Sequence, residues 1–140
     1  MRVLDRSNRK VNITGIDNHQ VTGLDIVTAA ALVTSDQGPI VLILHQYAYL
    51  GQGKTIHSSG QLEHYSIEVD DRSRVVKGKQ RIVTLEGYKI PLQVRDGLVY
   101  MDQSVPTDRD MEAYNHVIMT SDVDWDPAVL DTEIDIDDWN

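Results

Sequence analysis

The sequence of 140 residues predicts an all-β domain. Short runs rich in β-branched residues recur along it, and clusters of Gly, Asp, Asn or Pro separate them, which is the pattern of strands joined by turns. The run from Ile40 to Leu44 is continuously apolar, which indicates a strand covered on both faces. The pair Asp96-Gly97 stands between two alternating runs and is a strong hairpin signal.

The N-terminal third predicts two successive hairpins. Val11–Ile16 and Val21–Leu24 have strand character on either side of an Asp-Asn-His turn, and both contain glycine. Ile26–Thr34 carries three alanines that would also suit a helix. Its β-branched flanks and the turn at residues 35–39 favour a strand paired with Ile40–Leu44.

The middle of the chain predicts one short helix and a β-meander. Ile56–Tyr65 ends in a single helical turn, placed at about Gln61–His64, and Ser66–Val69 returns to strand character. Four further strands are expected at Arg74–Val76, Arg81–Leu85, Tyr88–Val94 and Leu98–Met101. Pro91 cannot donate to a β-ladder, so it indicates an edge strand or a bulge.

The C-terminal quarter differs from the rest in charge. Residues 1–107 hold 12 Lys and Arg against 11 Asp and Glu, whereas residues 108–140 hold one Arg against 11 acidic residues. Thr107 is a suitable N-cap for a helix, and His116–Thr120 reads as one more strand. We expect a β domain over residues 1–106 and an acidic extension over 107–140, disordered or loosely attached from Asp131 onward.

The composition excludes several classes of protein. The chain has the size of one domain and lacks cysteine, which rules out disulfides, thiol catalysis and cysteine-based zinc sites. No apolar run reaches the ~20 residues of a membrane helix, and MRVLDRSNRK does not begin a signal peptide. The body is close to neutral, and the basic run Arg72–Arg81 reads as a solvated hairpin. We expect an intracellular, cytoplasmic chain that binds neither membrane nor nucleic acid.

The order of these elements resembles a known family. Pro39–Val69 passes from a buried strand through a loop and a small-residue turn into a short helix and then another strand. This order is similar to the second half of a retropepsin monomer. The amino-acid sequence of the segment resembles more closely the protease region of copia-type LTR retrotransposon polyproteins. The residues from Asp122 to Asp131 also resemble a stretch that follows the protease region in some retroelements. The resemblance spans nearly the whole chain.

The resemblance implies a fold and two functional segments. The fold would be an incomplete retropepsin-like closed, bent β lobe with one short helix, followed by the acidic tail. The hairpin from Val11 to Ile26 would be the substrate flap, with candidate residues Ile13, Thr14, Gly15, Ile16 and Gly23. A turn supporting the active site would comprise Ser58, Ser59, Gly60, Gln61 and Leu62, whose small residues let backbones approach closely. The family also implies a homodimer and a peptide or polyprotein segment as partners.

The residues that would perform the chemistry are absent. Aspartic proteases need two carboxylates that share a proton, each carried by an Asp-Thr-Gly or Asp-Ser-Gly loop in the family. The chain contains neither string, and Asp36-Gln37-Gly38 and Asp96-Gly97 both read as hairpin turns. The catalytic loop would fall before Met1, through a late start of the reading frame or decay of the element. We therefore expect no catalytic residue and no protease activity from this chain alone.

Other catalytic and ligand sites are weakly indicated, and we expect no metal and no cofactor. Acidic residues have EF-hand spacing at Asp122, Asp124, Asp126 and Glu133. Pro127 occupies the position that needs glycine, so a solvated acidic tail is favoured over calcium binding. The five histidines lack metal-pair spacing, and we interpret them as structural or exposed. Gly51–Thr55 ends like a phosphate-binding loop, but Ala48 stands where that motif requires glycine.

Two rival functions stay open. The chain could be a non-catalytic β-rich module that binds a peptide or protein, with the flap-like hairpin contacting the peptide along a sheet edge. It could also be an active enzyme of another class. Acid-dependent, pepstatin-sensitive hydrolysis by the chain would overturn the expectation of inactivity. Peptide pulldown with retained specificity and no cleavage would favour the binding module.

Overall fold

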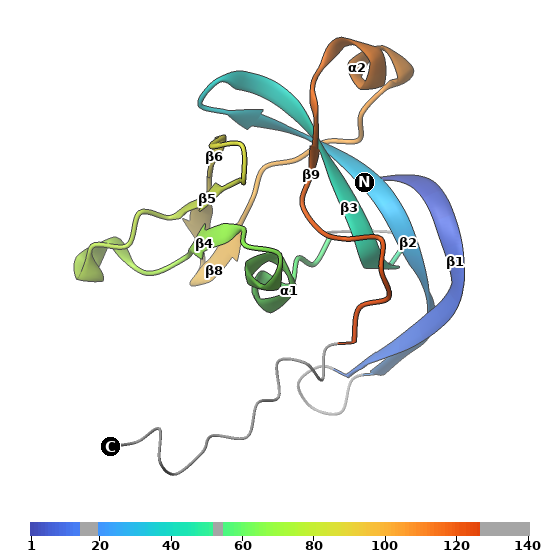
Figure 1. Cartoon of the computed structure of the whole chain (residues 1–140). Coiled ribbons are helices and arrows are strands. Elements are labelled where there is room, and N and C mark those ends of the chain that lie inside the picture. Colours follow the sequence, from blue (N-terminus) through green and yellow to red (C-terminus); the bar gives the residue numbers. More distant parts are fainter. Residues whose placement is uncertain (15–19, 52–54, 127–140) are drawn as a thin grey trace.

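The computed structural model describes residues 1–14, 20–51 and 55–126, and over these residues the chain is mostly β, as predicted. The main sheet has the order β1-β2-β3-β9 and curls around the core (Figure 1). Its strands are β1 (Arg2–Thr14), β2 (Gln20–Ser35), β3 (Gly38–Tyr49) and β9 (His116–Ile118). The first three strands are antiparallel, whereas β9 runs parallel to β3.

Both faces of the central strands are covered. On one face Leu42 and Leu44 belong to the main core, and on the other Val41 and Ile43 pack with Met111 of helix α2 (Asp108–Ala113). Side chains alternate across a strand, so coverage of both faces requires a continuous apolar run. The predictions of a two-faced strand at Ile40–Leu44 and of a strand rather than a helix at Ile26–Thr34 are confirmed.

A smaller sheet packs against the same core. It has the order β4-β5-β6, with β4 (Glu68–Asp70), β5 (Arg81–Val83) and β6 (Lys89–Pro91), and the hairpin β7 (Gln93–Arg95) and β8 (Leu98–Tyr100) follows. Ile82 and Ile90 are buried in the main core. Asp96 and Gly97 form the predicted turn between β7 and β8, both with positive φ, 51° and 78°, as a type I′ turn requires.

Pro91 lies in β6, an edge strand of the smaller sheet, as predicted. Leu92 N donates to Gln80 O, so the neighbouring register pair of Pro91 with Arg81 occupies a position without ladder hydrogen bonds. The missing N–H of the proline therefore removes no bond from the ladder. The predicted strand from Tyr88 to Val94 is divided at Leu92 into β6 and β7.

The strand predicted at Arg74–Val76 is wrong, because these residues form a 3-10 helix, η2. The carboxylate of Asp70 closes the loop that carries η2 by accepting from Lys79 N at 3.0 Å and Arg72 Nε at 3.1 Å. A Cβ at Gly78 would lie 2.0 Å from Arg72 O, so only glycine allows the two backbone segments to approach this closely. These closures within the loop override the β propensity of its two valines.

The two short helices agree with the sequence. Helix α1 (Ser59–His64) covers the predicted turn at Gln61–His64. Helix α2 begins at the predicted N-cap Thr107, whose hydroxyl accepts from Asp110 N while the Asp110 carboxylate accepts from Thr107 N. The predicted strand at His116–Thr120 is β9, so the acidic extension contributes a strand to the main sheet.

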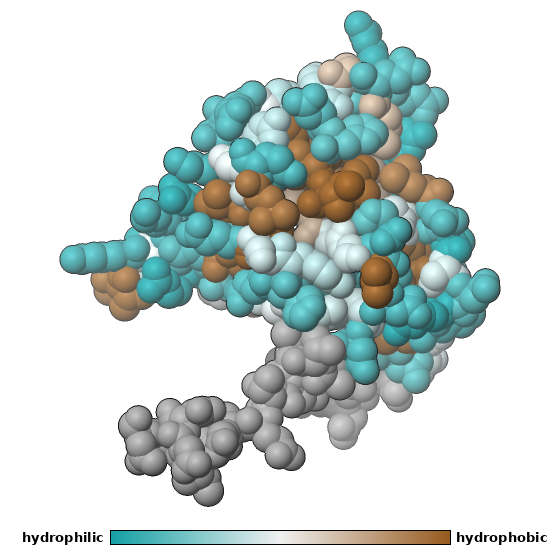
Figure 2. Space-filling view, in the orientation of Figure 1, coloured by the Kyte–Doolittle hydropathy of each residue, from teal (hydrophilic) through white to brown (hydrophobic). Residues whose placement is uncertain are grey.

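Hydrophilic side chains cover much of the surface, and a small apolar patch marks the tip of the loop around η2 (Figure 2). Val75 at this tip is 92% exposed. Among the described residues, no helix combines the length and the apolar character needed to cross a bilayer.

Candidate functional site

A β-bulge in β3 organises the centre of the molecule. The register between β2 and β3 shifts at this point, so that His45 and Gln46 together lie opposite Thr28, and Gln46 has a φ of 60°. A bulge of this kind leaves backbone groups without ladder partners and bends the strand. Those groups must find other partners, because an unpaired buried N–H or C=O is costly.

Two side chains from other elements supply these partners. The hydroxyl of Thr120, just after β9, accepts from His45 N at 2.8 Å and donates to His45 O at 2.7 Å. The buried amide of Gln61 in α1 donates to His45 O at 3.3 Å and to Gln46 O at 3.1 Å. The hydroxyl of Thr28 lies 2.9 Å from Nδ1 of the His45 ring. The bulge therefore connects β2, β3, α1 and the segment after β9.

The predicted support turn forms the beginning of α1. Ser58 is the N-cap, and its hydroxyl accepts from Gln61 N at 3.1 Å. At the other end Ser66 N donates to Glu63 O and Ile67 N to Leu62 O, which is the Schellman pattern. Leu62 and Ile67 are both only 2% exposed and belong to the core. Both helix ends are therefore satisfied locally, and the turn is held firmly beneath the bulge.

Arg9 joins the long outer strand β1 to the same centre. Its guanidinium donates to Gln46 Oε1 at 2.9 Å and to Trp125 O at 3.3 Å, and Trp125 N donates to the same Gln46 oxygen at 3.2 Å. The Trp125 ring is buried against the rings of His64 and Tyr65. The last described residues are thereby fixed against α1.

Three of the five residues predicted for the flap lie in strands β1 and β2. Ile13 and Thr14 end β1, where Thr14 pairs with Gln20, and Gly15 and Ile16 lie outside the described residues. Gly23 in β2 has a φ of 67°, and its N–H donates to the Asn12 side chain at 3.0 Å. The structure thus places the described flap residues in β1 and β2 and the support-turn residues at the beginning of α1.

A series of partly buried hydrogen bonds connects β3 to the segment after β8. Tyr47 Oη lies 2.9 Å from His57 Nδ1, and His57 Nε2 lies 2.8 Å from Gln103 Oε1. Gln103 Nε2 donates to the Thr55 hydroxyl at 3.1 Å. The amide oxygen can only accept, so His57 Nε2 carries the proton and Nδ1 accepts from Tyr47.

Burial sets the protonation states of the His57 and Tyr47 side chains. It lowers the pKa of His57 below its ordinary value, an effect that the Gln103 hydrogen bond opposes, and it raises the pKa of Tyr47. Both side chains are therefore neutral at neutral pH. His57 fits the predicted structural role, but the sequence did not indicate its partner Gln103, 46 residues away.

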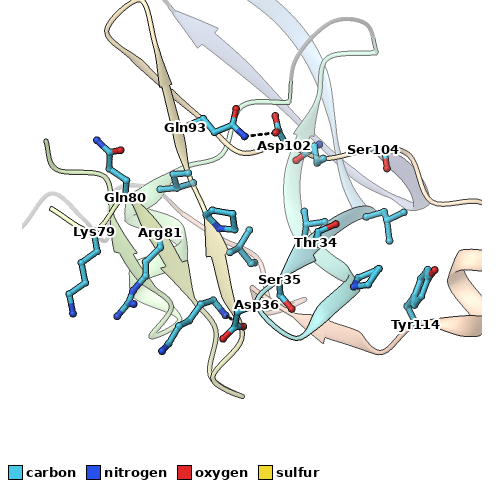
Figure 3. A pocket seen from close by; sticks show the side chains of 18 of the residues that line it. Thr34, Ser35, Asp36, Lys79, Gln80, Arg81, Gln93, Asp102, Ser104 and Tyr114 are labelled. Atoms are coloured by element: carbon cyan, nitrogen blue, oxygen red, sulfur yellow. Dashed lines mark hydrogen bonds between the residues drawn. The ribbon is translucent and has the colours of Figure 1, made fainter. Parts of the chain in front are cut away.

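A cavity of about 800 Å³ opens between the β2–β3 turn and the smaller sheet (Figure 3). Asp36 anchors one side, because its N–H donates to Lys89 O and its carboxylate accepts from Lys89 N, both at 2.9 Å. Gln93 and Asp102 are hydrogen-bonded at another side. Basic residues of the lining are Arg74, Lys79, Arg81 and Lys89. No sequence motif pointed to this cavity, because its walls come from separate segments.

The perturbed carboxylates do not resemble a protease pair. Hydrogen bonds from Lys10 and Arg6 lower the pKa of Asp25, and hydrogen bonds from Arg72 lower that of Asp70. A proton-sharing dyad requires one raised pKa instead. Asp36 and Asp96 both lie in hairpin turns, as predicted.

Among the described residues, no group of three His, Asp or Glu side chains could hold a metal ion. Of the acidic positions with EF-hand spacing, Asp122, Asp124 and Asp126 are described, and Glu133 lies outside the described residues. Comparison of the chain with protein-family models, with curated proteins and with solved structures finds no match.

Proposed function

We propose that this chain is a retropepsin-like β domain of the retroelement type that does not hydrolyse peptides by itself. The support turn carries the proposal: a capped short helix with buried Gln61 and Leu62 follows a two-faced inner strand and packs beneath its bulge. The long β1–β2 hairpin and the strand at Ile26–Thr34 agree with the same family order.

The chemistry favours an inactive domain. Peptide hydrolysis by this family's route needs an Asp-Thr-Gly or Asp-Ser-Gly loop, and the sequence contains neither. The carboxylates with shifted pKa, Asp25 and Asp70, are stabilised in the ionised form by basic neighbours. Neither of these two carboxylates has the raised pKa that one member of a proton-sharing pair shows.

A cleavage assay tests the inactivity. The full chain is incubated with a mixed peptide library from pH 3 to pH 7, with and without pepstatin, and the products are measured by mass spectrometry. Near-UV circular dichroism at each pH verifies that the chain is folded. We expect no cleavage above the enzyme-free control, and acid-dependent, pepstatin-sensitive hydrolysis would overturn the proposal.

The encoding locus tests the family. An in-frame Asp-Thr-Gly or Asp-Ser-Gly codon string shortly before the codon for Met1 would support the retropepsin-like assignment. Fusing that encoded segment to the chain should then produce pepstatin-sensitive cleavage, and a folded but inactive fusion would count against the family. The same fusion allows the homodimer implied by the resemblance to be measured by analytical ultracentrifugation.

A peptide-binding module is a second candidate, favoured by the cavity beside β6. Ligand pockets commonly have volumes of ~300–1,000 Å³, and the cavity of about 800 Å³ falls within this range. Its lining combines apolar side chains with polar groups from several segments. Binding of intact peptides at neutral pH, measured by fluorescence anisotropy and weakened by Ser104→Trp in the lining, would favour this candidate.

A further inference from the structure

Beside the smaller sheet lie three cationic side chains that form no ion pair with the described carboxylates. Lys79, Arg81 and Lys89, here called the basic face, all line the cavity. Arg81 begins β5, and Lys79 lies two residues before it, on the other side of Gln80, which has a φ of 49°. Figure 3 shows the side chains of Arg81 and Lys79 pointing away from the Gln93–Asp102 hydrogen bond.

The carboxylates of Asp70 and Asp36 accept from the backbone N–H groups of Lys79 and Lys89, but within the described residues none of the three cationic side chains forms an ion pair. Arg81 Nε is buried and has no hydrogen-bond acceptor. Grouped like charges repel, and a buried N–H without a partner is unfavourable, so this arrangement suits an anion that the described residues do not supply.

Carboxylate is the anion that fits this protein best. Arginine binds carboxylates with a planar, directional fork, and the lysines add charge at the rim. The net charge of the chain is −9, which opposes binding of a polyanion such as nucleic acid. The ligand is therefore a short acidic segment rather than a long charged polymer.

The chain itself contains such a segment. Residues 127–140 carry five acidic and no basic residues. From Glu133 to Asp137 the acids alternate with Ile134 and Ile136, so an extended chain would place the acids on one side. The segment follows Trp125, which is fixed against α1, and α1 packs against β4 of the smaller sheet.

The segment is long enough to reach the basic face. Fourteen extended residues span roughly 46 Å. A folded domain of this size has a radius of gyration of roughly 14 Å, so the segment can span a large part of its surface. Covalent attachment gives the segment an effective concentration in the millimolar range, which favours binding within one chain over binding between chains.

We propose that the basic face is a carboxylate-binding surface and that residues 127–140 of the same chain occupy it. This inference rests on the binding role proposed above and gives it a ligand class, an acidic extended segment. Binding of a neutral peptide elsewhere in the cavity would retain the binding role while overturning this inference.

Paramagnetic relaxation in the full chain tests the proposal. The sequence has no cysteine, so Asn140→Cys gives a single site for a nitroxide label. At 25 mM salt we expect at least a two-fold loss of amide signal at Lys79, Arg81 and Lys89. The signals should recover at 500 mM salt, because ion pairing at a surface is screened.

Charge-neutralising variants identify the groups involved. The triple variant K79Q/R81Q/K89Q should abolish the broadening, whereas the matched control R95Q, a cation already paired with Asp102, should leave it unchanged. Loss of the broadening with R95Q, its persistence in the triple variant, or uniform broadening over the surface would overturn the proposal.

A mixing experiment and a competitor exclude other occupants. Nitroxide-labelled chains without isotope enrichment are mixed with isotope-enriched chains that carry no nitroxide. The amide signals of the basic face should then show no broadening. Broadening in that mixture would assign the face to a second copy and overturn the proposal. An oligonucleotide that displaces the segment at physiological salt would likewise overturn it, by showing phosphate to be the preferred anion.

Discussion

The β3 bulge and the basic face differ in how their polar groups are satisfied. At the bulge, the N–H and C=O of His45 both bind the Thr120 hydroxyl, and Gln61 adds donors to His45 O and Gln46 O. On the basic face, Arg81 Nε is buried without an acceptor. The first arrangement stabilises the fold, whereas the second leaves binding capacity for a ligand. Substitutions in the two regions should therefore have opposite consequences.

The largest expected effect is at the support turn. Leu62→Ala removes a core side chain that is 2% exposed and leaves a cavity beneath the bulge. We expect a loss of about 2–5 kcal/mol in the free energy of unfolding, measured by urea denaturation. The neighbouring exposed residue provides the control, because Glu63→Ala should change stability by less than about 0.5 kcal/mol. Equal effects would show that the turn is not part of the core.

Thr120→Val should have the next largest effect. The two side chains have nearly the same shape, but valine leaves both His45 N and His45 O without their partner from Thr120. We expect a loss of about 1–3 kcal/mol in the free energy of unfolding, because these groups are shielded from water. Thr120→Ser keeps the hydroxyl and should recover most of that stability. If serine were no better than valine, the hydroxyl would not be what stabilises the bulge.

The environment of His57 predicts that the free energy of unfolding depends on pH. Burial lowers the folded-state pKa of His57 from its ordinary value of 6.5. Its neutral form is thus favoured by folding, and this contribution to stability is complete above about pH 6.5 and decreases as the pH falls toward the folded-state pKa. Urea denaturation at pH 7.5 and 5.5 should show a smaller acid-induced loss for His57→Asn than for the unsubstituted chain. An acid-induced loss for His57→Asn as large as that of the unsubstituted chain would contradict this prediction.

The smallest effect on stability is expected on the basic face. Arg81→Met retains much of the side-chain volume and removes the unpartnered Nε–H, so we expect a change within about 0.5 kcal/mol or a slight gain. Arg9→Met provides the matched comparison, because Arg9 binds Gln46 and Trp125 beside the bulge. That substitution should cost about 1 kcal/mol. A larger loss for Arg81 than for Arg9 would reverse the distinction between the two regions.

Local signals accounted for much of the fold. The Asp96-Gly97 turn, the Thr107 cap and the continuous apolar run at Ile40–Leu44 each depend on residues close in sequence, and the structure confirms all three. The failure at Arg74–Val76 has the opposite cause. There Asp70 and Gly78 close the loop, and loop closure outweighs the β propensity of two valines.

The sequence by itself determined the all-β character, the hairpins, the short helix and the acidic bias of the C-terminal quarter. Turns, helix caps and the alternation of side chains depend on residues that are close in sequence, so a local pattern is enough to predict them. Only the tertiary structure decided which distant groups meet. Thr120 reaches His45 across 75 residues, and the parallel pairing of β9 with β3 places it there. The cavity and the basic face depend in the same way on the packing of separate segments, which no local pattern specifies.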